Sequence, residues 1–322
     1  MTQEILANLY RIEIPLPGNP LKAVNSYLIE RQGRFLIIDT GMNRQECKDA
    51  MYGSLRELGV DLKRTDFFIT HLHSDHLGLV SSLATDTSTI YFNQPDASVA
   101  NSESHWDRIA DFAKTTGFSE AEIRMAIANH PGLKYRAKGP LDFCILKEDD
   151  TISIGDYLFK CVETPGHTKG HMCLYEPNQK IFVSGDHILN DITPNISLWS
   201  DDDNPLQEYL RSLDKVYAFD IGLVLPGHRA PFTDHRGRIQ ELKRHHQARA
   251  NEILSILEKG EQNAVQIASQ MTWDMSYASW EEFPIQQKWF AAAEAIAHLK
   301  YLEENKRITR EMGERWAVFS LR

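Results

Sequence analysis

The sequence reads His71-Leu72-His73-Ser74-Asp75-His76 directly after a short apolar run, Asp66–Thr70, which predicts a buried strand. In an extended chain, residues two apart point to the same side, so His71 and His73 can hold one cation together. Asp75 and His76 are offset from that pair and are available to a second cation. Imidazole and carboxylate groups suit Zn²⁺, and also Mn²⁺ or Fe²⁺. The stretch therefore predicts a metal-binding loop, and the alternative is a solvated loop whose histidines cluster by chance.

Three later motifs also place a histidine or an aspartate where predicted strands end. They are Thr164–His171, Ser184–His187 and Leu225–His228, which contain His167, Asp186 and His228 respectively. Each motif alone is a weak signal, because a histidine at a strand end is more often a hydrogen-bonded structural residue. Together with the first loop they provide five histidines and two aspartates, all in loops that follow strands. The sequence thus predicts one site assembled from distant loops.

In this order, the motifs resemble those of the metallo-β-lactamase superfamily, and Asp39-Thr40-Gly41 is similar to that family's first motif. The resemblance covers roughly residues 5–235. It implies an α+β fold, a four-layer αββα sandwich with a dinuclear metal site between its two sheets. The cofactors that it implies are two divalent metal ions, with zinc as the first expectation and manganese or iron as alternatives.

The resemblance also implies a role for each residue of the motifs. The first ion would take three histidine ligands: His71, His73 and His167. The second ion would take one aspartate and two histidines: Asp75, His76 and His228. Asp186 would bridge the two ions, and Asp39 would brace the ligand loop without binding metal. For Asp39 the alternative is a simple turn residue.

The chemistry implied by this ligand set is hydrolysis. Two ions that share a water molecule lower its pKa from ~15.7 toward ~7, and the resulting bridging hydroxide can attack a carbonyl or phosphoryl centre. Asp75 would act as the catalytic residue that orients the hydroxide and relays its proton. We expect a small ester, thioester or lactone as substrate. The alternative is a phosphodiesterase or endoribonuclease that acts on single-stranded RNA with the same metal site. A binding or regulatory protein stabilised by metal fits the complete ligand set poorly.

Departures from related families narrow the substrate. The zinc β-lactamases have Cys or Ser where this chain has Asp186, which disfavours antibiotic hydrolysis. Flavodiiron proteins have an acidic residue at the position of His73, which disfavours oxygen chemistry. The best-known acyl-homoserine lactonases have Tyr where this chain has Leu189, which disfavours that specificity. His187 and Arg229 flank metal ligands and are candidate substrate contacts; their alternative role is to support the ligands.

The chain divides into two predicted domains. Residues 1–238 form the catalytic domain with a helical insertion at 97–150, in which Ser119 and Glu122 have the spacing of a capping box. Strands resume after the insertion with a single long strand, Ile152–Val162. Residues 239–322 read as three helices followed by a two-stranded hairpin, and this order resembles the winged-helix tail of some superfamily hydrolases.

Charge limits the partners that this protein can bind. The 322 residues carry 35 basic and 45 acidic side chains, a formal net charge of −10. Residues 241–322 have no basic excess, with 11 Lys and Arg against 12 Asp and Glu. Because a negative field repels phosphates, a small-molecule substrate is favoured over nucleic acid, and a local basic groove is the exception left open. The apolar, tryptophan-bearing tail suggests a homodimer.

The sequence also predicts a cytoplasmic protein without a membrane contact. No apolar run approaches the ~18–20 residues that a membrane span needs. Met1–Pro15 has the alternation of a first strand and lacks the basic start and apolar core of a signal peptide. The four cysteines are widely spaced without a CxxC pair, which is typical of reduced thiols.

Overall fold

A computed structural model describes residues 1–274 and 277–322. Its contacts divide the chain into two units, of which the first contains residues 1–102, 131–194 and 212–238. The second unit contains residues 103–130, 195–211 and 239–322. One boundary between the two units falls after residue 238, where the sequence analysis also placed a boundary. Part of the expected insertion, residues 103–130, belongs to the second unit rather than to the first.

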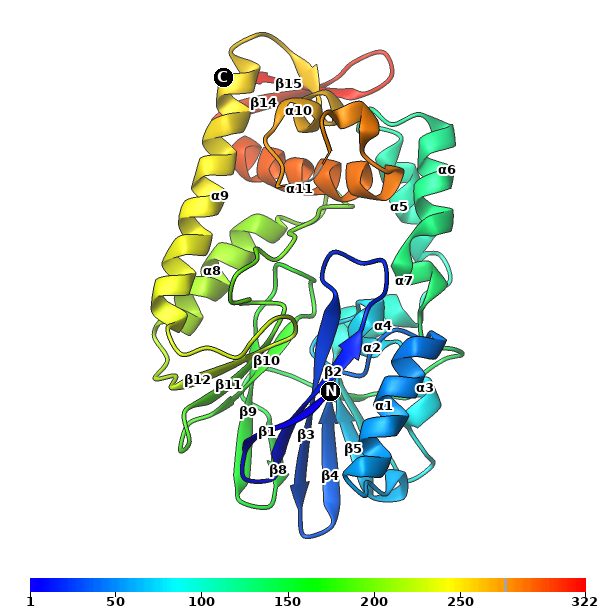
Figure 1. Ribbon diagram of the computed structural model, residues 1–322. Coiled ribbons are helices and arrows are strands. Elements are labelled where there is room, and N and C mark those ends of the chain that lie inside the picture. Colours follow the sequence, from blue (N-terminus) through cyan, green and yellow to red (C-terminus); the bar gives the residue numbers. More distant parts are fainter. Residues whose placement is uncertain (275–276) are drawn as a thin grey trace. The chain divides into compact units, whose positions relative to one another are not determined.

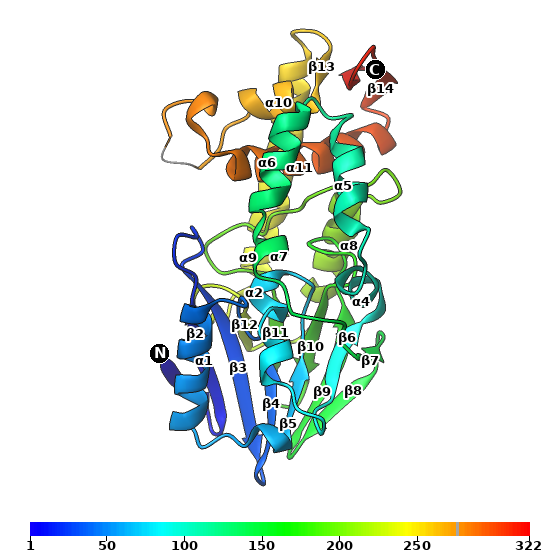
Figure 2. The same cartoon turned by 90° about the vertical axis from the view of Figure 1, so that its right-hand side faces the viewer.

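The first unit is built on two β-sheets, whose strands are labelled in Figure 1 and Figure 2. The larger sheet has seven strands in chain order: β1 (Thr2–Leu6), β2 (Leu9–Pro15), β3 (Ala23–Arg31), β4 (Arg34–Ile38), β5 (Thr65–Phe68), β6 (Ile90–Asn93) and β7 (Cys144–Leu146). The smaller sheet has five strands in the order β12 (Leu223–Pro226), β11 (Ile181–Gly185), β10 (Met172–Glu176), β9 (Tyr157–Glu163) and β8 (Thr151–Ile154).

The seven-stranded sheet divides its side chains between two cores, because successive residues of a strand point to opposite faces. In β4, Leu36 and Ile38 belong to a core shared with the five-stranded sheet, to which Phe159 and Leu174 contribute. The intervening residues of β4 join a second core, which includes Cys47, Met51 and Leu55 of helix α1 (Gln45–Glu57). The order helix, sheet, sheet therefore follows from the two-residue period of the strands.

A helix also covers the other face of the five-stranded sheet. Phe182 and Val224 alternate with residues of the inner core, so their side chains point away from it, and both are fully buried. Leu213 and Val216 of α8 (Pro205–Tyr217) are also fully buried. The ring of Phe219, just after α8, lies 6.3 Å from that of Phe182. The first unit thus has the predicted αββα order of layers.

Two sequence expectations for this unit are wrong. The single strand predicted over 152–162 is a hairpin of β8 and β9, because Gly155 takes a φ of 56° and turns the chain. The expected helical insertion also contains a strand, since β7 pairs in parallel with β6. Only three residues long, β7 is too short to show the alternation that identifies a strand in a sequence.

Shorter helices complete the first unit. They are α2 (Ser74–Leu77), α3 (Val80–Leu83), α4 (Gln94–Ala100), α7 (Pro131–Lys134) and the 3₁₀ helix η1 (Leu62–Arg64). No helix among the described residues is long and apolar enough to cross a bilayer. All four cysteines are unpaired in the structure.

The second unit is mainly helical. Its helices are α5 (His105–Ala113), α6 (Glu120–Asn129), most of α9 (His235–Leu257), α10 (Ala264–Gln270), η2 (Trp280–Glu282) and α11 (Ile285–Glu304). The predicted capping box at the start of α6 is present. The expected hairpin, β14 (Ile308–Met312) and β15 (Ala317–Leu321), pairs with the short strand β13 (Gln262–Asn263). The element order is the predicted one, whereas its assignment to the winged-helix class stays a prediction.

Two histidines meet in the core of the second unit. His246 Nδ1 lies 3.1 Å from His298 Nε2, and His298 Nδ1 donates to the carbonyl of Glu294 at 2.8 Å. Burial, assisted by the charge of Arg249, lowers the pKa of His298 to about 4. A proton on Nε2 of His298 would turn it from an acceptor into a second donor facing His246. The folded protein therefore keeps His298 neutral.

We predict that acid weakens the folded state through His298. Its pKa is ~6.5 in the unfolded chain, so the unfolded state takes up a proton first and the free energy of unfolding falls from pH 6.5 toward pH 4. His298→Gln, which keeps a polar group there, should flatten this fall by up to ~1.4 kcal/mol per pH unit. Urea unfolding of both proteins at several pH values measures the difference. Parallel curves would contradict the expected protonation of His298.

Candidate metal centre

The seven predicted ligands all lie in the first unit, after its strands; Asp75 and His76 are on the short helix α2 and the other five are in loops. His71 and its neighbours follow β5, His167 follows β9, and His228 follows β12. Asp186 comes directly after β11. Six of the seven side chains are buried and His73 is half-buried. The structure therefore brings the seven predicted ligands together.

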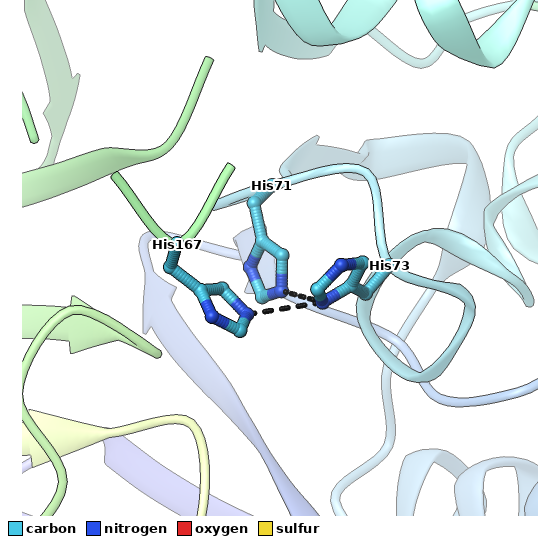
Figure 3. A group of neighbouring side chains, drawn as sticks. All are labelled: His71, His73 and His167. Carbon is cyan, nitrogen blue, oxygen red and sulfur yellow. Dashed lines mark hydrogen bonds between the residues drawn. The ribbon is translucent and has the colours of Figure 1, made fainter. Parts of the chain in front are cut away.

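Three histidines form the first group of this cluster (Figure 3). His73 Nδ1 lies 3.1 Å from His71 Nε2 and 3.0 Å from His167 Nε2, so three ring nitrogens converge on one point. Figure 3 shows the three rings turned toward one another from two separate loops. One cation can accept three such lone pairs, and the three residues form a group with metal-binding spacing.

The second group consists of Asp75, His76 and His228. His228 Nε2 lies 3.5 Å from Asp75 Oδ2, and His76 Nε2 lies 4.0 Å from the same oxygen. Two different residues can therefore direct a nitrogen toward the Asp75 carboxylate.

Asp186 lies between the two groups. Its Oδ2 is 3.5 Å from His167 Nε2 of the first group and 3.4 Å from His228 Nε2 of the second. Its Oδ1 is 3.5 Å from His76 Nε2. Asp186 therefore contacts residues of both groups, and its bridging of two ions stays a prediction.

Hydrogen bonds on the outer side fix which nitrogen three of the histidines present to the cluster. His76 Nδ1 donates to Asp39 Oδ2 at 2.8 Å, and His228 Nδ1 donates to the carbonyl of Ala23 at 2.7 Å. Thr70 Oγ1 donates to Asp39, so its lone pair is available to His71 Nδ1 at 3.0 Å. In each case Nδ1 is bonded on the outer side, so Nε2 is the nitrogen that faces inward and can offer its lone pair to a metal ion. This is the arrangement that a metal ligand needs.

Asp39 holds this arrangement from behind. Its carboxylate accepts from the Thr70 backbone N–H at 2.9 Å and from the Thr70 hydroxyl at 2.8 Å, as well as from His76. Asp39 itself has a φ of 58°, in the left-handed region that non-glycine residues rarely adopt. Such strain persists where surrounding contacts maintain it and is frequent at functional sites. Asp39 is therefore more than the turn residue that the sequence left as the alternative.

The inward-facing atoms are short of hydrogen bonds. Among the described residues, His76 Nε2, His228 Nε2 and Asp186 Oδ1 are buried and make none. A buried polar group without a partner costs ~1–3 kcal/mol, and more when it is charged. Nitrogen and carboxylate donors left in this way fit divalent metal ions, which would satisfy them together.

The pKa values of the histidines shift in opposite directions in the two groups. Burial, followed by the neighbouring imidazoles, lowers the pKa of His73 to about 3 and that of His71 well below its usual value. Burial also disfavours protonated His228, but the charges of Asp186 and Asp75 raise its pKa to about 10. The first group thus offers neutral nitrogens. In the second group the carboxylates are negatively charged and stabilise a positive charge next to them. A cation meets both conditions.

Sequence reasoning assigned no role to His171, which also supports the site. Its Nε2 accepts from the backbone N–H of Asp186 at 3.1 Å, so its Nδ1 carries a proton for Thr164 Oγ1 at 2.7 Å. His171 therefore positions the backbone of Asp186 and is a buried structural histidine rather than a ligand. Its place in the motif Thr164–His171 was a signal, but the backbone bond is visible only in the folded chain.

The two predicted substrate contacts differ in exposure. His187 is fully buried, with its ring centroid 6.2 Å from that of His171. Arg229 is partly exposed, and its Nε lies 3.6 Å from Asp191 Oδ1. Contact of either residue with a substrate stays a prediction.

Comparison with known proteins shows the family. The model of the metallo-beta-lactamase superfamily matches residues 19–228, which is more than half of the chain. The chain therefore belongs to the metallo-beta-lactamase superfamily. With the His and Asp clusters described above, this makes it a metal-dependent hydrolase of that superfamily, as the sequence predicted.

Two named relatives are similar over different shares of the chain. The protein called "Probable metallo-hydrolase YqjP" from Bacillus subtilis is 25% identical over 328 residues, which covers 96% of this chain and 95% of that protein. The human "Acyl-coenzyme A thioesterase MBLAC2" is 25% identical over 215 residues, which covers 63% of this chain and 72% of that protein.

Two solved structures match the fold along nearly the whole chain. A metallo-beta-lactamase family protein from Thermus thermophilus has a TM-score of 0.79 and 27% identity, covering 99% of this chain and 100% of that one. A beta-lactamase domain protein from Burkholderia ambifaria has a TM-score of 0.82 and 25% identity, covering 100% of this chain and 93% of that one. The metallo-beta-lactamase fold is thereby confirmed.

We predict that the purified protein binds two divalent metal ions per chain, and that His167→Ala binds one. The substitution removes a nitrogen from the first group and leaves Asp75, His76 and His228 in place. Elemental analysis after expression with added zinc measures the content. His245→Ala, on α9 outside the cluster, is the matched control and should retain both ions. A wild-type protein without metal under these conditions would refute the assignment of the site.

Proposed function

We propose that this member of the metallo-beta-lactamase superfamily hydrolyses a small ester, thioester or lactone with two divalent metal ions, zinc first. One observation carries the proposal: three buried atoms that face inward and could bind metal make no hydrogen bond. They are His76 Nε2, His228 Nε2 and Asp186 Oδ1. His71, His73 and His167 would hold the first ion, Asp75, His76 and His228 the second, and Asp186 both. When bound, two such ions acidify a water molecule and stabilise negative charge on a carbonyl oxygen.

The chain's own residues prepare the site for this reaction. Asp39, Thr70 and the carbonyl of Ala23 keep the imidazoles in the tautomer that faces inward. Because these bonds exist before substrate binds, the electrostatic environment requires little reorganisation during the reaction. His171 positions Asp186 in advance as well, by accepting the backbone N–H of Asp186. These residues orient the reacting groups without touching the substrate.

Asp75 is the residue that we assign to proton transfer. Burial disfavours its ionised form, but the neighbouring His76 and His228 outweigh this effect and lower the pKa of Asp75 below its usual value. Asp75 is therefore an ionised carboxylate, which can orient a water molecule by accepting its hydrogen bond. It is also 8% exposed, whereas His76 and His228 are fully buried, so solvent reaches it.

Two observations support a small carbonyl substrate. A human relative that is similar over 63% of this chain is named an acyl-coenzyme A thioesterase, which makes thioesters a specific class to test. The net charge of −10 opposes long nucleic-acid substrates, because their phosphates are repelled at a distance. Local positive charge from bound metal would still attract a small anionic substrate.

Several further features remain part of the proposal. His187 and Arg229 would contact substrate, and the protein would work in the cytoplasm as a homodimer. The C-terminal helices and hairpin would form a winged-helix-like domain that packs rather than binds nucleic acid, in line with its lack of basic excess.

We predict that the zinc-loaded protein turns over carbonyl substrates in preference to phosphodiesters. A parallel panel of p-nitrophenyl esters, acyl thioesters, lactones, bis-p-nitrophenyl phosphate and single-stranded RNA at physiological salt measures kcat/KM for each class. Hydrolysis of at least one carbonyl class should exceed that of both phosphodiesters. Preferential cleavage of RNA would instead establish the endoribonuclease alternative.

We predict that Asp75→Asn lowers kcat by ~10²–10⁴-fold, the usual contribution of general acid–base catalysis. Asparagine has a similar shape but cannot accept the proton. Metal content and circular dichroism should be recorded together with kcat, to separate lost proton transfer from lost ligation. Asp220→Asn, at an exposed ion pair with Lys180, is the control and should keep its activity. Unchanged turnover in Asp75→Asn would remove Asp75 from the mechanism.

A further inference from the structure

A buried carboxylate outside the ligand set connects two of the ligand loops. Asp96 lies on α4 and its side chain is almost fully buried, with 1% of the residue exposed. Its Oδ2 accepts from the backbone N–H of Leu72 at 2.9 Å and from the hydroxyl of Thr168 at 2.7 Å. Its Oδ1 accepts from the backbone N–H of Gly170 at 2.7 Å. The three bonds together use both carboxylate oxygens.

The donors are next to the first group of histidines. Leu72 lies between His71 and His73, and Thr168 directly follows His167. One side chain therefore joins the two loops that carry all three residues of that group. None of the second group's residues lies in the loop 167–170. Displacing Asp96 would change the spacing between His167 and the other two histidines, whereas the bonds that hold His76 and His228 from the outside go to Asp39 and Ala23 and do not involve Asp96.

Gly170 shows how closely the loop approaches this carboxylate. A Cβ atom at position 170 would lie 2.6 Å from the backbone nitrogen of Asp96 and 2.7 Å from Asp96 Oδ1. These distances are too short for a side chain, so only glycine allows the contact. The position is part of the motif Thr164–His171, and the metal ligands do not account for it. Contact with Asp96 does.

The three hydrogen bonds come from neutral groups, two backbone amides and a hydroxyl. Burial raises the pKa of Asp96 to about 6, although these bonds favour the ionised form. A buried carboxylate stabilised only by neutral donors costs free energy in the folded state. Its placement is explained by the geometry that it imposes on the loops rather than by its contribution to stability.

We propose that Asp96 is a positioning residue that sets the metal affinity of the group formed by His71, His73 and His167. This inference rests on the proposed function in one respect, namely that the group binds a metal ion. Asp96 touches neither the ion nor the substrate. It acts through the backbone of Leu72 and through the loop that follows His167, holding three ring nitrogens at the spacing that one cation needs.

The test compares zinc binding by the full-length wild-type protein, Asp96→Asn and Asp96→Ala, using competition with a chromophoric chelator. Asparagine keeps one acceptor oxygen, but its NH₂ group then faces a donor, so it cannot satisfy all three bonds. We expect one of the two zinc ions to bind 10–100-fold more weakly, the range known for groups that orient metal ligands, and the other to change less than about twofold. The weakened step should be the one that His167→Ala abolishes.

The matched control is Asp66→Asn. Asp66 Oδ1 also accepts a backbone N–H, that of Thr89 at 2.9 Å, but Asp66 precedes the ligands on β5 and, among the described residues, accepts no hydrogen bond from their loops. Both zinc affinities of this variant should match the wild type. If Asp96→Ala does not fold, Thr168→Val removes a single donor and should weaken the same step several-fold.

The outcomes separate this inference from the proposed function. Wild-type protein that binds no zinc refutes the metal site itself. Wild-type protein with two ions, together with Asp96→Asn that binds both as tightly, overturns the role of Asp96 alone. Equal weakening of both ions in Asp96→Asn also overturns it, because that result indicates a general structural role rather than a specific effect on the first group.

Discussion

The first unit depends on burying seven imidazole and carboxylate groups face to face, an arrangement that needs positive charge among them. The inward nitrogens and oxygens have few hydrogen-bond partners, whereas the outward nitrogens are bonded to the protein. The outward nitrogens therefore have hydrogen-bond partners, and the inward atoms named above do not. Asp39, which accepts hydrogen bonds from Thr70 and His76 on the outer side, has a left-handed backbone conformation.

Sheet topology explains how distant segments reach one place. The pairs β4–β5 and β11–β12 are parallel, and the carboxyl ends of parallel strands lie at the same edge of a sheet. Asp39 and His71 therefore follow neighbouring strands of one sheet, as Asp186 and His228 do in the other. The apolar cores on both sides of β4 hold these strands in register. The geometry of the site therefore depends on the packing of the cores, because a shift of one strand would move the ligand that follows it.

Much of the site was predictable because its ligands have side chains of distinctive chemistry at short spacings. The loop that begins at His71 contains four ligands, and His167, Asp186 and His228 each follow an apolar strand. The supporting residues were not predictable. Asp96 acts on backbone amides of Leu72 and Gly170, and any residue type except proline can supply such a donor. The hairpin at Gly155 was missed for a similar reason, since β8 and β9 have continuous strand character on both sides of a short turn.

The sequence by itself determined the metal-ligand types, the order of the motifs and the alternation that divides the larger sheet between two cores. These properties reside in side-chain chemistry and in the two-residue period of a strand. Only the tertiary structure decided how closely the predicted ligands approach one another, which nitrogen His228 turns inward and which buried acid, Asp96, joins two of their loops. It also placed residues 103–130 with the C-terminal helices. Those features depend on contacts between segments far apart in the chain, and such contacts leave no periodic or local pattern in the sequence.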